Sequence, residues 1–243
     1  MEEKTSGYER TGMGAELKLL LREPPLLLSI LAVFLIFAVF VIYPFAKILF
    51  VPTGNDWVRA VTAPEFIEVF SHTIYSSLAA TGTAIVFGFI FAYGVNYTNM
   101  PCKRFFQVVA LLPTMAPSVV SGLAFIMLFG RRGFITWELL RLKIDLYGPI
   151  GLWVAQSIAF FPLAYITISG VLKNISPNLE LAAQNLGARG WYLFRTVTLR
   201  LATPGLASAF LLVAINSLAD FGNPMLVGGN YHVLATEAYA QVT

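Results

Sequence analysis

Residues 73–102, TIYSSLAATGTAIVFGFIFAYGVNYTNMPC, contain no aspartate, glutamate, lysine or arginine. Residues 26–46, 105–130 and 146–172 are equally uncharged, and residues 201–228 contain one acid. A helix needs about 20 apolar residues to cross a bilayer, and each of these stretches is long enough. Lipid offers no water to unpaired backbone groups, so the stretches are expected to be helical. The sequence therefore predicts an all-α polytopic membrane protein with spans near 26–49, 73–98, 105–129, 148–172 and 203–227.

The composition agrees with this fold class, because 57% of the residues are hydrophobic and 12% are charged, against about 25% charged residues in soluble domains. The formal net charge of +3 is small, so we expect contact with membrane lipid and no nucleic-acid partner. Cys102 is the one cysteine, which excludes an internal disulfide and a CxxC metal or redox site. We expect neither a metal site nor catalytic residues.

Basic residues are unequally distributed between the predicted loops. Those before span one, after span two and after span four fall on one side of the membrane if the N-terminus is cytoplasmic, as the positive-inside rule requires. The loop after span three is the exception, with Arg131, Arg132, Arg141 and Lys143. Its stretch FITWELLRLKID, residues 134–145, has apolar side chains at helical spacing between charges, which is typical of a helix at the membrane surface.

The predicted organisation is a cytoplasmic N-terminal segment, residues 1–24, followed by a transmembrane domain, residues 25–243. After the fifth span the chain continues as the polar stretch GNYHVLATEAYAQVT, residues 229–243, with no sixth apolar run. We therefore expect a truncated sequence, or one part of a longer polypeptide, that lacks a sixth span.

The loop between spans four and five, residues 176–204, reads SPNLELAAQNLGARGWYLFRTVTLRLATP. Ser176 is a good N-cap and Pro177 fits the first helical turn, so a short helix is expected there. Gly187 suits a left-handed turn at the end of that helix, and a second helix is expected from Gly190 to Leu199. Such a helix-turn-helix on the cytoplasmic face can dock a soluble partner, or it can be a solvated connector.

This loop resembles the EAA loop of binding-protein-dependent ABC transporter permeases, and we call it the EAA-like loop (residues 176–204). The family's pattern is Glu-Ala-Ala, three residues, Gly, nine residues, Ile, one residue and Leu-Pro. Ala182, Ala183, Gly187 and Leu199 match it, and Val197 stands for the isoleucine.

Two positions depart from the pattern. Leu181 occupies the glutamate position, although Glu180 is adjacent, and Arg200 replaces the proline. In the family the glutamate and the glycine turn help to seat the loop in a groove of the ATPase subunit, so the carboxylate contact is in question here. The residues that the resemblance assigns to ATPase coupling are Glu180, Leu181, Ala182, Ala183, Gly187, Trp191, Phe194 and Leu199.

A second stretch, ADFGNPMLVGGNYHVLAT at residues 219–236, looks like the segment after the fifth span of ferric iron permeases. The resemblance covers residues 25–243 and implies a type I-like ABC importer fold, of which this sequence would be the first half. It also implies a multi-pass protein in the cytoplasmic (inner) membrane of a bacterium or archaeon. The implied partners are ABC ATPase subunits, an extracytoplasmic solute-binding protein and a second permease half.

The chain itself contains no Gly-Lys dipeptide and hence no P-loop. We therefore expect no enzyme and no cofactor bound by this chain, with ATP and Mg²⁺ used by the partner ATPase. Iron(III) is the first expected solute. A polyamine, a phosphonate or a sulfate- or molybdate-like oxyanion is the alternative.

Asp220 is the acid inside the fifth apolar stretch, and its burial would cost about 3 kcal/mol at a helix centre unless it faces protein or water. Asn216 shares a helical face with it at i, i+4, and Asn223 is near. One interpretation is a polar section of a translocation path. The other, which we favour, is a hydrogen-bonded cap between helices at the outer end of span five.

Two further features of the spans allow a functional and a packing interpretation. Pro113 and Pro117, with Ser118, predict a kinked third span that either lines the pore or only packs. Gly82 and Gly88 in span two are expected at close helix contacts. The predicted translocation-path residues are Pro113, Ser118, Asn216, Asp220 and Asn223.

A competing functional class is a secondary transporter or channel that is driven by an ion gradient, with Asp220 as its ion or proton site. It leaves the EAA-like loop unexplained. His72 and His232 fall in predicted outer loops, far apart in the sequence, and are expected to be incidental.

Overall fold

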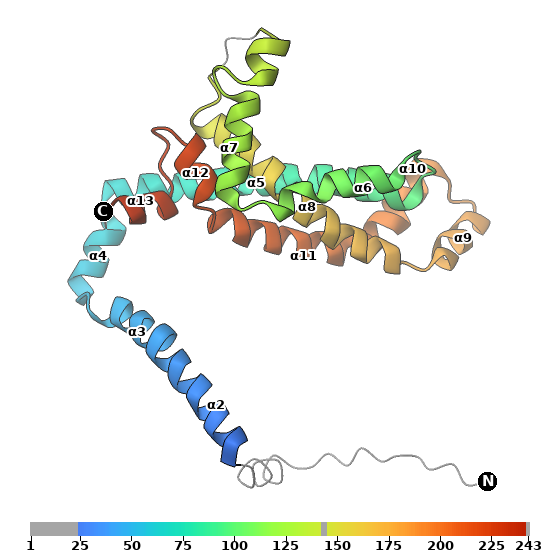
Figure 1. Cartoon of the computed structure of the whole chain (residues 1–243). Helices are drawn as coiled ribbons and strands as arrows, with labels where there is room; N and C mark the ends of the chain where they lie inside the picture. Colours follow the sequence, from blue (N-terminus) through green and yellow to red (C-terminus); the bar gives the residue numbers. More distant parts are fainter. Residues whose placement is uncertain (1–23, 142–144, 242–243) are drawn as a thin grey trace, which may run out of the picture. The chain divides into compact units, whose positions relative to one another are not determined.

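The computed structural model describes residues 24–141 and 145–241 (Figure 1), and all regular elements within these ranges are helices. The chain divides into two compact units, Met1–Ala63 and Pro64–Thr243. The described residues contain five helices that are long and apolar enough to cross a membrane. The predicted fold class and number of spans are confirmed.

The first unit contains one candidate span, Pro24–Phe50. It is built from α2 (Pro24–Phe37), η1 (Ala38–Ile42) and α3 (Tyr43–Phe50), and none of their residues is buried. The short α4 (Gly54–Thr62) follows. The Asp56 carboxylate accepts the Thr53 backbone N–H at 2.9 Å, which fixes the start of this helix because the first amides of a helix have no partner within it.

Three long helices form the centre of the second unit: α5 (Pro64–Tyr97), α8 (Pro149–Asn174) and α11 (Leu199–Leu218). They lie side by side in Figure 1 and contact one another pairwise. Small residues allow the close approach that drives helix association in lipid. A Cβ added to Gly88 would lie 2.8 Å from the Ala164 Cβ, and one added to Gly205 would lie 2.7 Å from the Val171 Cβ.

The prediction for the glycines of span two is therefore confirmed for Gly88 and wrong for Gly82, where an added Cβ would meet nothing within 4 Å. The start predicted for span two, near residue 73, is too late. Residues 64–71 already belong to α5, because Pro64 begins a helix that continues without a break to Tyr97.

The third predicted span, 105–129, is not one helix. It consists of α6 (Lys103–Leu111), the short η2 (Leu112–Met115) and α7 (Ser118–Phe129). Ala116 is extended, at φ −98° and ψ 134°, because proline disfavours the helical conformation of the residue before it. The candidate span at this place is Ser118–Leu139 and includes η3 (Phe134–Leu139). The predicted kink is thus a complete break.

Of the described part of the helix predicted over residues 134–145, only η3 is present, and its predicted place at the membrane surface stays a prediction. Residues 142–144 of the predicted helix lie outside the described residues.

The fifth span is predicted at residues 203–227, but the observed helix begins and ends earlier in the sequence. The second helix of the EAA-like loop, made of α10 (Gly190–Leu193) and η4 (Phe194–Thr198), continues directly into α11, and the candidate span is Gly190–Leu218. The helix is interrupted at residues 219–221, and two separate short helices follow, α12 (Gly222–Val227) and α13 (Leu234–Ala240). In Figure 1, α12 lies beside α7, and the two helices are in contact.

Candidate functional site: the EAA-like loop

The first helix of the EAA-like loop is α9 (Pro177–Asn185), with Ser176 at the N-cap position and Pro177 in the first turn. It ends as the sequence predicts, because Gly187 has φ +92° and avoids the strain that a side chain would cause there. The Ala188 N–H donates to the Ala183 carbonyl at 3.0 Å and closes the turn. Gly190 also has a positive φ, and the chain then enters α10.

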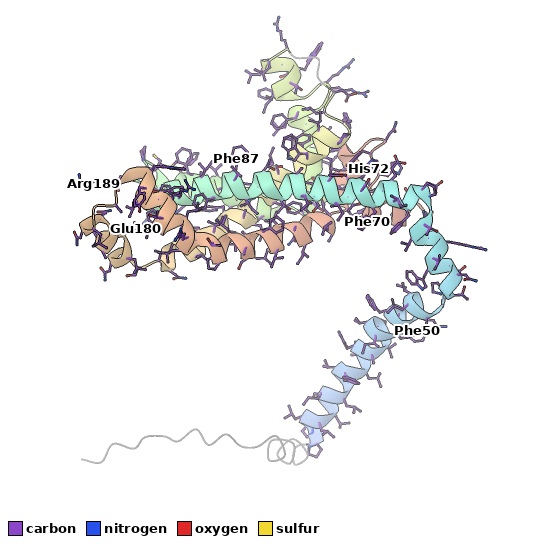
Figure 2. The ribbon with its side chains drawn as sticks, turned by 180° about the vertical axis from the view of Figure 1, so that it is seen from behind. Phe50, Phe70, His72, Phe87, Glu180 and Arg189 are labelled. Atoms are coloured by element: carbon purple, nitrogen blue, oxygen red, sulfur yellow. The ribbon has the colours of Figure 1, made fainter. Side chains whose placement is uncertain are left out.

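The tip of this loop exposes large apolar side chains. Leu186 is 90% exposed, Trp191 73% and Tyr192 66%. Figure 2 shows Glu180 and Arg189 of the loop at one end of the second unit, with Phe70 and His72 at the other end of α5. Apolar side chains gathered on a loop of this kind indicate a surface that another protein or the membrane covers.

Phe194, one of the residues predicted for ATPase coupling, packs against α5. Its ring lies against Tyr93 and Phe89 of α5, with centroid distances of 5.3 and 5.9 Å, and Trp191 stacks on it at 5.0 Å. Phe194 therefore attaches α10 and η4 to α5 and gives Trp191 a defined position. Trp191 and Tyr192, rather than Phe194, are the exposed aromatic side chains.

The Glu180 carboxylate accepts a hydrogen bond from the Thr198 hydroxyl at 2.7 Å. Thr198 is 2% exposed and lies at the end of η4, directly before α11. This contact joins the helix after the fourth span to the helix that becomes the fifth. The sequence analysis missed Thr198, and the available signal was only its place between Val197 and Leu199 on the second helix.

The other predicted residues of the loop divide by exposure. Leu181, Ala182 and Gly187 are exposed, Ala183 is half-buried, and Leu199 is half-buried as the first residue of α11. Leu186 and Tyr192 were not among the predicted site residues although they are more exposed than Leu181. Their positions at the glycine turn and beside Trp191 are the signals that would have identified them.

At the other end of the second unit, the Asp220 carboxylate is buried in a polar network. It accepts hydrogen bonds from the Gln156 side chain of α8 at 3.1 Å and from the Asn223 side chain of α12 at 2.8 Å. The Ser217 hydroxyl donates to the Gln156 side-chain oxygen at 3.2 Å. This geometry agrees with the favoured interpretation, a hydrogen-bonded cap between helices where α11 ends.

The predicted translocation-path residues do not all come together. Asn216 is exposed and donates to the Leu212 carbonyl of its own helix, so its predicted association with Asp220 is wrong. The chain turns after Leu218, which separates the two side chains. Ser118 lies against Gly222 of α12, beside Asn223, whereas Pro113 lines a mainly apolar cavity of about 260 Å³ beside α7 and α8.

The two histidines are adjacent, contrary to our expectation that they are incidental. The His72 ring stacks on Tyr231 at 4.0 Å, and its Nδ1 lies 3.2 Å from the His232 carbonyl oxygen. The Tyr231 hydroxyl donates to the His72 carbonyl at 3.0 Å. His72 belongs to α5 rather than to a loop, and it helps to hold residues 231–232 against that helix.

Beside them, His232 Nδ1 lies 3.0 Å from a Glu237 carboxylate oxygen. This hydrogen bond, followed by one from Gln241, lowers the pKa of the Glu237 carboxyl below its usual range. In the residues that the structure describes, no three histidine, cysteine, aspartate or glutamate side chains gather in a way that could hold a metal ion.

A family model described as a binding-protein-dependent transport system inner membrane component matches residues 84–240. The ferric transport system permease protein FbpB of Actinobacillus pleuropneumoniae is 31% identical over 93% of this chain. The chain spans 34% of the length of that relative. The molybdenum transport system permease protein ModB of Escherichia coli is 33% identical over 67% of this chain and 71% of its own.

Among solved structures, the crystal structure of a bacterial ABC transporter involved in the import of the acidic polysaccharide alginate has a similar fold. Its matching chain has a TM-score of 0.72 and 19% sequence identity, over 93% of this chain and 86% of its own. The family match covers the EAA-like loop and all three central helices from residue 84 onward. The chain belongs to the family of binding-protein-dependent transport system inner membrane components.

Proposed function

We propose that this chain forms the membrane-spanning part, or one half of it, of an ATP-driven ABC importer. The observation that carries this proposal is the EAA-like loop, which exposes Leu186, Trp191 and Tyr192 at one end of the second unit. Exposed aromatic and aliphatic side chains of this kind are typical anchors of a protein interface. A soluble ABC ATPase is the partner that the family membership supports.

In this mechanism, two ATPase subunits close when they bind ATP, and their movement reaches the membrane through the EAA-like loop. The loop is connected directly to α8 on one side and to α11 on the other. A cavity between this chain and a second permease half then alternates its access between the two sides of the membrane. An extracytoplasmic binding protein delivers the solute, and the N-terminus lies in the cytoplasm.

The first test is co-purification from native membranes. We expect a soluble P-loop ATPase to be recovered with the wild-type chain and lost from a Leu186→Glu, Trp191→Glu variant, because two carboxylates would have to be buried in the interface. Val58→Glu is the matched control, since Val58 is also an exposed apolar side chain and lies on the short helix α4, outside the EAA-like loop. Recovery of no ATPase with the wild-type chain would contradict the proposed function.

For the solute we propose iron(III), which the relatives named as ferric transport permeases support. Relatives named for sulfate and molybdenum transport also match. Iron(III) prefers several oxygen ligands, and the described residues contain no such acidic cluster, so the binding protein is expected to select the solute. Uptake of radiolabelled iron(III), sulfate and molybdate by cells with and without the chain would distinguish them. If cells without the chain lost only sulfate or molybdate uptake, that anion would replace iron(III) as the proposed solute.

A further inference from the structure

The Glu180 carboxylate is the one side-chain hydrogen-bonding group of α9 that reaches another helix, as far as residues 24–141 and 145–241 show. No residue of α9 is buried, so its packing against the second unit contributes little. Leu179 and Leu181, on either side of Glu180, are both about half exposed. The attachment of α9 to the helix of the fifth span therefore depends on very few contacts.

The acceptor and the donor of this contact differ in their surroundings. Glu180 is half-buried, whereas Thr198 is 2% exposed and therefore has a fixed position at the beginning of α11. A hydrogen bond to an ionised carboxylate is stronger than one between neutral groups. The Glu180 charge is also close enough to Tyr97, at the end of α5, to interact with it electrostatically. The carboxylate thus lies where α5, α9 and η4 meet.

We propose that Glu180 is a positioning residue that couples α9 to α11 through Thr198, and that it does not bind the ATPase directly. The inference rests on the proposed function, because it says how the movement of a docked ATPase reaches the fifth span. It also accounts for the departure of this chain from the Glu-Ala-Ala pattern. Leu181, in the usual glutamate position, is exposed and apolar, while the adjacent carboxylate is turned toward the chain's own Thr198.

The test uses the complete transport complex in lipid vesicles and measures both ATP hydrolysis and solute uptake. Glu180→Ala and Thr198→Val should each raise the ATP hydrolysed per solute transported about fivefold, the effect of losing one hydrogen bond worth about 1 kcal/mol. The double variant should be no worse than either single one, because both remove the same interaction. Glu180→Gln keeps an acceptor oxygen and should remain within about twofold of wild type.

Retention of the ATPase separates the two possible roles of Glu180. A positioning role predicts that every variant still co-purifies with the ATPase. A direct contact predicts that Glu180→Ala and Glu180→Gln both lose the ATPase while Thr198→Val keeps it, and this outcome would overturn the inference. Additive effects in the double variant, or unchanged coupling in both single variants, would overturn it as well.

A partner-independent measurement covers the case in which the proposed function itself fails. Hydrogen exchange of the full chain in lipid nanodiscs should show the α9 amides exchanging about fivefold faster in Glu180→Ala and Thr198→Val than in wild type or Glu180→Gln. Equal exchange in all four proteins would refute the coupling contact, whether or not an ATPase binds.

Discussion

At the residue scale, Asp220 shows how a carboxylate within an apolar stretch of sequence is accommodated. A carboxylate inside an apolar stretch is costly unless its oxygens are paired, and here donors from α8 and α12 approach it. The composition of the stretch was sufficient to single out Asp220. The identity of its partners was not predictable, because Gln156 is 64 positions away and only the packing of α8 beside α11 brings it near.

We expect Asp220→Asn to destabilise the protein by about 1–3 kcal/mol, because the new amide group presents donors to the donors of Gln156 and Asn223. Thermal unfolding in mild detergent would measure this loss. Asn216→Ala, on the exposed side of α11, should stay near wild type. Normal stability with complete loss of solute uptake would instead favour an ion-driven transporter with Asp220 as its ion site.

Glu237, which lies in α13 and contacts His232, predicts that the stability of this helix depends on pH. Its pKa is lowered in the folded chain, first by the hydrogen bond from His232 and then by that from Gln241. The interaction therefore contributes stability above the unfolded pKa of glutamate, about 4.3, and this contribution is lost as the pH falls through the lower folded pKa.

The hydrogen-exchange protection factors of α13, the exchange rates of an unfolded chain divided by the observed rates at the same pH, should therefore fall progressively below about pH 4.3 when measured from pH 7 down to pH 3. Glu237→Gln should remove the pH dependence of the α13 protection factors without changing those of α8. A wild-type profile identical to that of the variant would argue against a role for the His232–Glu237 pair.

At the element scale, the central helices illustrate what hydrophobic patterning can and cannot determine. The uncharged runs correctly located α5, α8 and much of α11, because a bilayer sets both the length and the composition of a span. The ends were less predictable, since polar and aromatic residues also continue these helices beyond the apolar runs. Pro113 and Pro117 indicated a kink, but whether the chain bends or breaks there depends on packing against α8.

Glycine substitutions test the close contacts between these helices. Gly88→Val and Gly205→Val should each lower the stability by about 1–3 kcal/mol, because the added carbons would overlap Ala164 or Val171. Gly82→Ala is the control, and its added carbon meets no neighbour. It should be neutral or stabilise α5 by up to about 1 kcal/mol. Thermal unfolding of the purified variants would check all three, and equal effects at Gly82 and Gly88 would contradict the observed packing.

At the scale of the whole molecule, the second unit has chemically different ends. The carboxyl ends of α8 and α5 lie together; the EAA-like loop follows α8, and Cys102 follows α5. The His72–Tyr231 contact lies at the other end of α5. The sequence predicted the EAA-like loop from its glycine turn and alanines, which are local features. It did not predict the contact between His72 and Tyr231, because these residues meet only through the course of the entire chain.

Cys102 provides a direct test of the predicted orientation, since it is exposed and is the one cysteine of the sequence. A membrane-impermeant maleimide should label it only after the cytoplasmic side of the membrane is opened. In a Cys102→Ser background, a cysteine introduced at Asn230, which is exposed, should be labelled in intact cells with a permeabilised outer envelope. The reverse pattern would place the N-terminus outside.

The continuity of α10, η4 and α11 gives the second unit a simple mechanical property. The 29 residues of Gly190–Leu218 form a continuous helical run of about 43 Å at 1.5 Å per residue, and a close contact, Gly205 against Val171, lies near its midpoint. If that contact acts as a pivot, a tilt of about 10° would displace each end by about 4 Å in opposite directions. A small inward push on the exposed Trp191 would then displace the far end of the helix next to Asp220, and the hydrogen bond from Ser217 to Gln156 would have to break for that end to move.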